Sequence, residues 1–333
     1  MRNNYVQCLC LLLLVSPIYI SLSVNGETGH LKIGAFNVRI FGASKMAKTS
    51  VVNVLVDIIM RYDIVLIQEI RDASGDAIEQ LLDKINEKSP ENTFAMKLSP
   101  RLGRSSSKEQ YAFLYREKSG LKIDRDYVYD DGDETLNTDT TKVDTFEREP
   151  YVVLFESSAT KLKRFAFAGL HIAPSDAVKE LQALENVFDD IKTKLNIDDI
   201  MIMGDFNADC SYVPNYKWET IPIKSNPSYT WWIGDEADTT VANTNCAYDR
   251  FVSTGQGFET GVVNGSASVY TFDRAFQLNQ TFLLDVSDHY PIEFELINDS
   301  ETSDAQQDCV SNMLLLVIQC VILRRQFYLL KVF

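Results

Sequence analysis

The sequence predicts an α/β fold in which two β-sheets pack face to face and helices cover their outer surfaces. From Leu31 to Ile297, short apolar segments alternate with amphipathic ones, first as strand–helix–strand–helix and then as a run of strands. The segments IVLIQ (64–68), FAFAGL (165–170) and IMIMG (200–204) are apolar on both faces, which predicts strands that are buried on both sides. No linker, repeat or low-complexity break interrupts this stretch, so we expect one domain over residues 31–297.

The individual elements follow from the same patterns. Ser175 and Asp176 follow Pro174 and are residue types favoured at helix N-caps. The segment 130–149 is acidic and rich in threonine, which predicts a long exposed loop that a cation could organise. The expected strands are Leu31–Asn37, Ile64–Glu69, Phe94–Leu98, Tyr111–Arg116, Tyr151–Glu156, Phe165–His171, Ile200–Asp205, Tyr248–Ser253 and Tyr290–Ile297, and the expected helices are Lys45–Arg61, Gly75–Lys88 and Ala177–Leu195.

Composition limits the classes of function. The 333 residues are 45% hydrophobic and 24% charged, as in ordinary globular proteins. The net charge of −15 excludes a protein that grips nucleic acid through a broad basic surface. It leaves room for an enzyme that processes a polyanion at a site neutralised by a divalent cation and a few local arginines.

The N-terminal residues have the features of a secretory signal peptide. Arg2 precedes the apolar stretch Val6–Ile20, and small and polar residues follow from Ser21 to Gly29. We therefore expect residues 1–26 to be a signal peptide and the protein to be secreted. The alternative is an N-terminal membrane anchor, although Pro17 interrupts a run that is already short for spanning a bilayer.

The C-terminal residues 298–333 combine a polar spacer, Asn298–Asp308, with an apolar run, Met313–Leu323. This run is shorter than the roughly 17–25 residues of a transmembrane helix. A polar spacer before an apolar tail is typical of a glycolipid-anchor signal, but Arg324 and Arg325 depart from that pattern. A glycolipid anchor at the cell surface, a loose hydrophobic tail and an interfacial segment all remain open.

Cys210 and Cys246 are the two cysteines within the predicted domain. In an oxidising compartment they can pair, and the alternative is a pair of free buried thiols. Three Asn-x-Ser/Thr triplets, at Asn264, Asn279 and Asn298, fit the same secretory route and would make the protein a glycoprotein.

Polar residues stand at the ends of five predicted strands. Because open α/β folds place their sites at one rim of a sheet, we expect these side chains to converge there. The residues concerned are Asn37, Glu69, His171, Asp205 with Asn207, and Asp288 with His289.

The chemistry of this set is that of a hydrolytic metal site. His171 and His289 suit general acid–base catalysis near neutral pH, and the alternative is two structural histidines. The remaining side chains offer oxygen ligands, which favours Mg²⁺, Mn²⁺ or Ca²⁺ over Zn²⁺.

Eight segments in order resemble the secreted deoxyribonuclease I family and span nearly all of residues 31–297. They are LKIGAFNVRIFG (31–42), YDIVLIQEIRD (62–72), LGRSSSKEQYAFLYR (102–116), REPYVV (148–153), LHIAPSDAV (170–178), MGDFNADCSYV (203–213), NCAYDR (245–250) and SDHYP (287–291). GDFN and SDHYP alone would indicate only the wider endonuclease/exonuclease/phosphatase superfamily. The resemblance implies a four-layer α/β/β/α sandwich. It also implies a divalent-metal-dependent endonuclease that cuts double-stranded DNA with little sequence specificity and leaves 5′-phosphate and 3′-hydroxyl ends.

The resemblance also implies roles for individual residues. His171 would be the general acid, oriented by Glu109, and His289 the general base, held by Asp249. Metal and phosphate would be held by Asn37, Glu69, Asp205, Asn207 and Asp288, with Mg²⁺ or Mn²⁺ as the catalytic ion. DNA would be bound by Arg39, Arg71 and Arg148, and Cys210 and Cys246 match the family's main disulfide.

Some positions depart from the family pattern. Ser107 stands where the family's type member has a groove-contacting Tyr, and residues 130–145 lack a second small disulfide. Structural Ca²⁺ sites would use Asp131, Asp144 and Phe146 in the acidic loop, and Asp238 and Thr240 elsewhere. The surface that binds actin in the type member matches poorly at Met96, Leu98, Pro100 and Tyr151, so we expect weak or no actin binding and no obligate protein partner.

Two other functions compete with the nuclease. A phosphodiesterase acting on a lipid or small phosphoester would share the metal and both histidines, but it would lack the three arginines as a set. A non-catalytic surface protein could keep the fold, but the intact His171, His289, Glu109, Asp205 and Asp249 argue against it.

Overall fold

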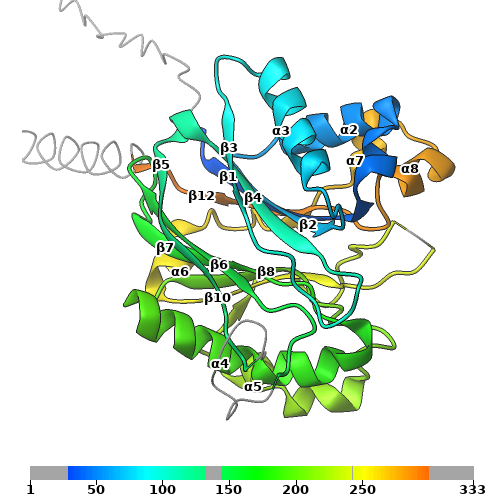
Figure 1. Cartoon of the computed structure of the whole chain (residues 1–333). Helices are drawn as coiled ribbons and strands as arrows, with labels where there is room; N and C mark the ends of the chain where they lie inside the picture. Colours follow the sequence, from blue (N-terminus) through cyan, green and yellow to red (C-terminus); the bar gives the residue numbers. More distant parts are fainter. Residues whose placement is uncertain (1–28, 133–143, 242, 300–333) are drawn as a thin grey trace, which may run out of the picture.

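The computed structural model describes residues 29–132, 144–241 and 243–299. Two six-stranded mixed sheets pack face to face over this part of the chain, and helices cover the outer face of each (Figure 1). The predicted four-layer α/β/β/α sandwich is confirmed. The predicted signal peptide, the tail from residue 300 and the centre of the acidic loop lie outside the described residues.

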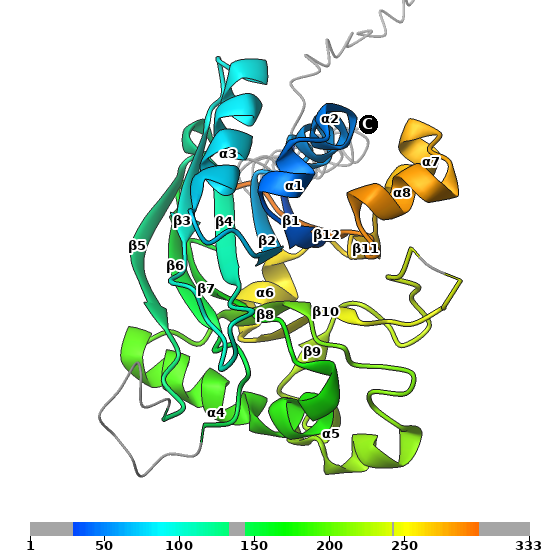
Figure 2. The same ribbon diagram turned by 45° about the vertical axis from the view of Figure 1, so that its right-hand side comes forward.

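The first sheet has the strand order β11-β12-β1-β2-β4-β3. β1 and β2 run parallel, and the other neighbours are antiparallel. Its outer face carries α2, α3, α7 and α8 (Figure 2). The strands are β1 (Leu31–Phe41), β2 (Ile64–Ile70), β3 (Phe94–Leu98), β4 (Gln110–Arg116), β11 (Ser268–Val269) and β12 (Ile292–Leu296), and the helices are α1 (Ala43–Met46), α2 (Thr49–Ile59), α3 (Asp76–Lys88), α7 (Phe272–Phe276) and α8 (Gln280–Val286).

The second sheet has the order β5-β6-β7-β8-β10-β9, with β7 and β8 parallel. The long helix α4 lies across its outer face, with α5 beside it (Figure 1). The strands are β5 (Leu121–Val128), β6 (Tyr151–Ser157), β7 (Arg164–Gly169), β8 (Ile200–Asp205), β9 (Thr230–Trp231) and β10 (Asp249–Thr254), and the helices are α4 (Ala177–Leu195), α5 (Pro222–Ser225) and α6 (Gln256–Gly261), with 3₁₀ turns at Glu117–Ser119, Pro174–Asp176 and Asn215–Thr220.

The main hydrophobic core lies between the two sheets. Leu66 and Phe113 from the first sheet and Phe155, Phe167 and Met203 from the second are all fully buried. Phe155, Phe165 and Phe167 form ring contacts with centroids 4.9–5.7 Å apart. Burying each such side chain stabilises the fold by about 1.5–3 kcal/mol, and this packed core supports the ends of the strands.

The elements differ from the sequence prediction in a few places. The predicted helix 45–61 divides into α1 and α2 at Lys48, whose backbone leaves the helical region. β5 was not predicted, because its sequence LKIDRDYV carries charged residues as expected for an edge strand. Asp176 occupies the N-cap position of α4, as predicted. Its side chain accepts no capping hydrogen bond, so the predicted capping contact is wrong.

The helices of the described segments include none with the length and apolar character needed to cross a membrane.

Candidate active site

The polar strand ends meet at one rim of the double sheet. β1 and β2 are parallel and end there, as does β8, while the antiparallel β10 and β12 begin there. A pocket of about 230 Å³ opens at this rim. Its lining includes Glu69, His171, Asp205, Asn207, Asp288 and His289, together with Pro174, Tyr212, Thr240, Thr244 and Tyr248.

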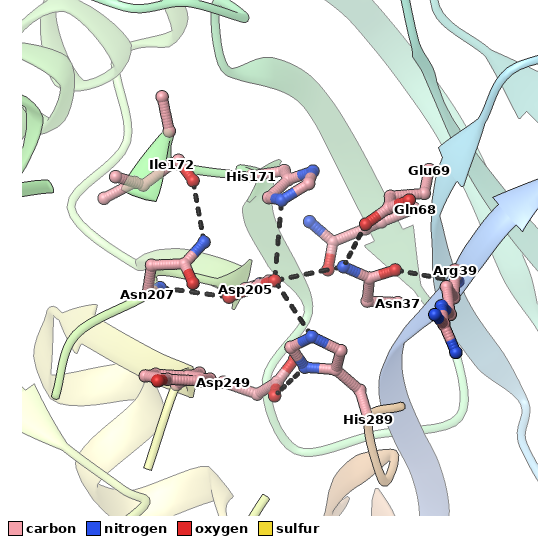
Figure 3. A network of polar contacts seen from close by, with 12 residues as sticks. Asn37, Arg39, Gln68, Glu69, His171, Ile172, Asp205, Asn207, Asp249 and His289 are labelled. Atoms are coloured by element: carbon pink, nitrogen blue, oxygen red, sulfur yellow. Dashed lines mark hydrogen bonds and ion pairs between the residues drawn. The ribbon is translucent and has the colours of Figure 1, made fainter. Parts of the chain in front are cut away.

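Both imidazoles face the same carboxylate oxygen. His171 Nε2 lies 3.5 Å and His289 Nε2 lies 3.4 Å from Oδ2 of Asp205 (Figure 3). All three side chains are nearly inaccessible to solvent. Two groups able to donate or accept a proton therefore flank one buried anionic centre.

A second carboxylate orients each ring from behind. His171 Nδ1 is 2.8 Å from Oε2 of Glu109, and His289 Nδ1 is 2.8 Å from Oδ2 of Asp249. When a ring is neutral, such a partner favours the proton on Nδ1 and leaves the lone pair of Nε2 facing the pocket. The two pairs thus present equivalent atoms to the same space.

The charges around the rings shift their acidities. Burial alone would raise the pKa of Glu109, but the hydrogen bond to His171 and the charges of His171, Arg148 and Arg71 together lower it to about 2. Burial alone would lower the pKa of His289, but Asp249, Asp205 and Asp288 together raise it to about 10. In the cation-free protein the His289 ring is therefore protonated at neutral pH.

Asn37 joins two of the three acidic side chains of the predicted metal set. Its Nδ2 donates to Oε1 of Glu69 over 3.1 Å and to Oδ2 of Asp205 over 3.0 Å (Figure 3). The backbone N–H of Asn207 donates to the other oxygen of Asp205 over 3.0 Å. Carboxylates and amides from β1, β2 and β8 are consequently held within hydrogen-bonding distance of one another.

The donor set fits a hard divalent cation. One oxygen each of Asp249 and Asp288 is buried and accepts no hydrogen bond from the described residues. Ligand atoms of Asp205, Asp249 and His289 lie within 4.8 Å of one another. This group shares only Asp205 with the predicted set Asn37, Glu69, Asp205, Asn207 and Asp288. Both sets are dominated by oxygen, as Mg²⁺ and Ca²⁺ require.

The three predicted DNA-binding arginines lie at different depths. Arg39 is the most exposed, and its Nε is 3.4 Å from Oδ2 of Asp288. Arg71 contacts Glu69 and Glu109 over 3.2 and 2.7 Å. Arg148 is buried, and its Nε donates to the carbonyl oxygen of His171 over 3.0 Å. Arg148 therefore supports His171 from within the protein.

The residues predicted for structural calcium lie in two separate places. Oδ2 of Asp131 accepts from the N–H groups of Thr145 and Phe146, and its buried Oδ1 accepts no hydrogen bond within the described ranges. Asp144 stands at the other end of the same partly described loop. Oδ1 of Asp238 accepts from the N–H and Oγ1 of Thr240.

Cys210 and Cys246 form a disulfide that closes a 36-residue separation. Cys210 follows β8 and Cys246 precedes β10, so the bond ties the segment of Asp205 and Asn207 to that of Asp249. The predicted pairing is present in the structure.

Sequence reasoning missed several residues that build the site. Gln68 donates from Nε2 to the carbonyl oxygen of Leu170 over 2.7 Å and accepts from the N–H of Asp205 over 3.0 Å, which joins the two sheets. Ser287 donates from Oγ to the carbonyl oxygen of Asn37 over 2.6 Å. A lone Gln in an otherwise apolar strand and a Ser directly before Asp288 were signals that could have found them.

Comparisons with known proteins agree with this geometry. A sequence model described as the Endonuclease/Exonuclease/phosphatase family matches residues 34–289. Deoxyribonuclease-1 of Bos taurus is 47% identical over 266 residues, which cover 80% of this chain and 92% of the relative. Deoxyribonuclease gamma of Homo sapiens is 42% identical over 291 residues, which cover 86% and 90%. The fold is shared with an endonuclease/exonuclease/phosphatase from Bacteroides vulgatus, with a TM-score of 0.53 at 16% identity, covering 81% of this chain and all of that one.

Proposed function

Since the chain belongs to the deoxyribonuclease I family of the endonuclease/exonuclease/phosphatase superfamily, we propose that it hydrolyses double-stranded DNA with the help of a divalent cation. The chain is an endodeoxyribonuclease of the deoxyribonuclease I type, as its identity to these enzymes over most of their length shows. The products would carry 5′-phosphate and 3′-hydroxyl ends.

The observation that carries the proposed mechanism is the placement of two imidazoles on one oxygen of Asp205. Hydrolysis of a phosphodiester needs a base that takes a proton from the attacking water and an acid that gives one to the leaving oxygen. His289 Nε2 would take the water proton, with Asp249 stabilising the charged ring. His171 Nε2 would give a proton to the leaving 3′ oxygen, with Glu109 fixing the ring's orientation.

Asn37, Glu69, Asp205, Asn207 and Asp288 would hold the catalytic Mg²⁺ or Mn²⁺. When bound, the cation neutralises charge on the phosphate and offsets the carboxylates that keep His289 protonated. Asn37 keeps Glu69 and Asp205 together, and Gln68 fixes the backbone of Asp205. Structural Ca²⁺ would be bound by Asp238 with Thr240 and by Asp131 with Asp144.

The arginines supply local positive charge in an acidic protein. Arg39, 44% exposed at its side chain, is the best placed of the three to contact a DNA phosphate. Arg71 reaches the pocket edge at Glu69, and Arg148 would act through His171 and Glu109. Contacts to backbone phosphates carry little sequence information, so we expect little specificity.

We infer the cellular setting from the sequence patterns near the two chain ends and from the disulfide. We propose residues 1–26 as a signal peptide, residues 31–297 as the catalytic domain and residues 298–333 as a tail. The disulfide fits an oxidising, extracellular compartment. A glycolipid anchor at the tail remains one option, and neither actin nor an obligate protein partner is expected to bind.

The test is nicking of supercoiled plasmid by the protein secreted from eukaryotic cells, with Mg²⁺ and Ca²⁺ and with chelator. We expect nicking that the chelator abolishes and ends that a DNA ligase reseals, because resealing requires a 5′-phosphate and a 3′-hydroxyl. A parallel assay uses sphingomyelin. Hydrolysis of the lipid without nicking of the plasmid would support the competing phosphodiesterase instead.

A further inference from the structure

Ile40 has an unusual backbone and an unusual environment. Its φ is +49°, directly after Arg39 with φ of +45°. A positive φ is a genuine outlier for a β-branched residue. Its side chain is also 56% exposed, and among the described residues only Tyr212 and Tyr216 are other exposed large hydrophobics.

The active site itself holds this backbone in place. The N–H of Ile40 donates to Oε2 of Glu69 over 2.8 Å, and the N–H of Arg39 donates to Oδ1 of Asn37 over 2.9 Å. Lys45 Nζ donates to the carbonyl oxygen of Arg39 over 2.7 Å. These contacts explain the strained conformation, but none of them uses the isoleucine side chain. Glycine or asparagine would adopt the same backbone at lower energy.

Ile40 lines a second cavity of about 330 Å³ beside the active-site pocket. Ser44, Lys45, Lys48, Leu284 and Asp285 line it as well, and the carboxylate of Asp285 is paired with Lys48. Arg39 also lines it and reaches back to Asp288 of the active-site pocket through its contact of 3.4 Å. A DNA strand that leaves the active site past Arg39 would then reach the cavity that Ile40 lines.

The chemistry of such a strand matches the cavity. Each nucleotide offers an anionic phosphate and an apolar deoxyribose face in alternation. Next to the guanidinium of Arg39, which suits a phosphate, the exposed methyl groups of Ile40 and the nearby Leu284 suit the adjoining sugar.

We propose that Ile40 is a substrate-contacting residue that packs against a deoxyribose next to the cleaved phosphodiester. The proposal rests on the proposed function, because it requires DNA in the neighbouring pocket. The hydrogen bonds from the active site hold the strained backbone, and the side chain gains contact area when DNA binds.

The test compares Ile40→Gly and Ile40→Asn with the wild-type chain by steady-state cleavage of duplex DNA and by thermal unfolding. Both substitutions relieve the strain, so Tm should be no lower than that of wild type. Both remove apolar contact, so KM should rise about 3- to 10-fold, while kcat stays within about two-fold. Ile40→Val, which keeps an apolar β-branched side chain, should keep the KM.

Tyr216→Ser is the matched control, because Tyr216 is 73% exposed and lines neither cavity. It should change neither KM nor kcat. A KM within two-fold of wild type in both the Gly and the Asn variants would overturn the proposal. So would a fall in kcat at constant KM, which would assign Ile40 to the positioning of Glu69 instead. If the proposed function itself is wrong, the wild-type protein does not cleave DNA at all.

Discussion

The buried ammonium group of Lys45 donates a hydrogen bond of 2.8 Å to the carbonyl oxygen of Val286. The same group donates to the carbonyl oxygens of Val38 and Arg39. It thereby ties the irregular end of β1 to the segment that leads into Asp288 and His289. Burial lowers the pKa of Lys45 to about 8, so the group still carries its charge at neutral pH.

Replacing Lys45 by Met should destabilise the protein and impair catalysis together. Three carbonyl oxygens lose their donor, and we expect a loss of about 2–4 kcal/mol in the free energy of unfolding. We also expect kcat to fall by about tenfold or more, because Asp288 and His289 lose a support. Denaturant unfolding and plasmid nicking measure the two effects.

Lys48→Met is the matched control for stability. Lys48 is half exposed and pairs with the exposed Asp285 over 2.7 Å. Such a surface pair contributes about 0–1 kcal/mol, so its loss should be small. Equal destabilisation by the two substitutions would contradict the role assigned to Lys45.

The two histidines should behave as one catalytic unit. Each of His171→Ala and His289→Ala should reduce kcat by about 10²–10⁴-fold, the usual contribution of a general acid or base. Because both would act in the same proton-transfer sequence, the double variant should be much less impaired than the product of the single effects. Single-turnover cleavage of a defined duplex measures this, and fully multiplicative losses would show that the rings act independently.

Gly204 should tolerate no side chain. A Cβ there would lie 2.5 Å from the carbonyl oxygen of Leu170 and 2.6 Å from Nε2 of Gln68, and φ is +130°. We expect Gly204→Ala to cost about 3 kcal/mol or more and to weaken cation-dependent activity by displacing Asp205. Thermal unfolding and a Mg²⁺ titration of the nicking rate check this.

Gly265→Ala separates the two causes of the expected destabilisation, which are steric contact of the new Cβ and backbone strain at a positive φ. Gly265 also has a positive φ, +75°, but a Cβ there would meet nothing within 4 Å. It should cost about 1 kcal/mol from the backbone alone and leave the Mg²⁺ requirement unchanged. If both alanine variants lose the same stability, steric contact at Gly204 is not the reason for its loss.

The sequence predicted the layers and most strands because burial on both faces leaves an unbroken apolar run, as in β2 and β8. It also indicated which polar residues share a rim, because each follows or precedes such a run. It could not predict β5, whose edge position leaves charged residues in the strand. Nor could it predict the roles of Gln68 and Lys45, because these depend on carbonyl groups that only the tertiary fold brings near.

The depth of Arg148 shows the same limit. Its sequence position suggested a DNA contact, but the fold buries it between His171 and Glu109. A sequence pattern places a charge near the site, whereas only packing decides whether that charge faces the solvent.

Glu180 should make stability depend on pH. Its Oε1 accepts from the N–H groups of Glu147 and Ala173, and its buried Oε2 accepts no hydrogen bond from the part of the chain that the structure describes. Burial raises its pKa from 4.5 to about 8. Between pH 4.5 and about pH 8, Glu180 is protonated in the folded state and ionised in the unfolded state. The contribution of the protonated Glu180 to the free energy of unfolding is therefore complete below pH 4.5 and is lost as the pH rises through 8.

Glu180→Gln should remove this dependence, because the amide keeps an acceptor for both N–H groups and cannot ionise. With about 1.36 kcal/mol per pKa unit, the wild type should lose on the order of 4 kcal/mol relative to the variant across this range. Unfolding free energies measured at pH 5, 7 and 9 should thus converge at pH 5 and separate at pH 9. Asp189→Asn, at an exposed position of the same helix, is the control and should follow the wild type. Parallel curves for wild type and Glu180→Gln would show that Glu180 is ionised in the folded protein throughout.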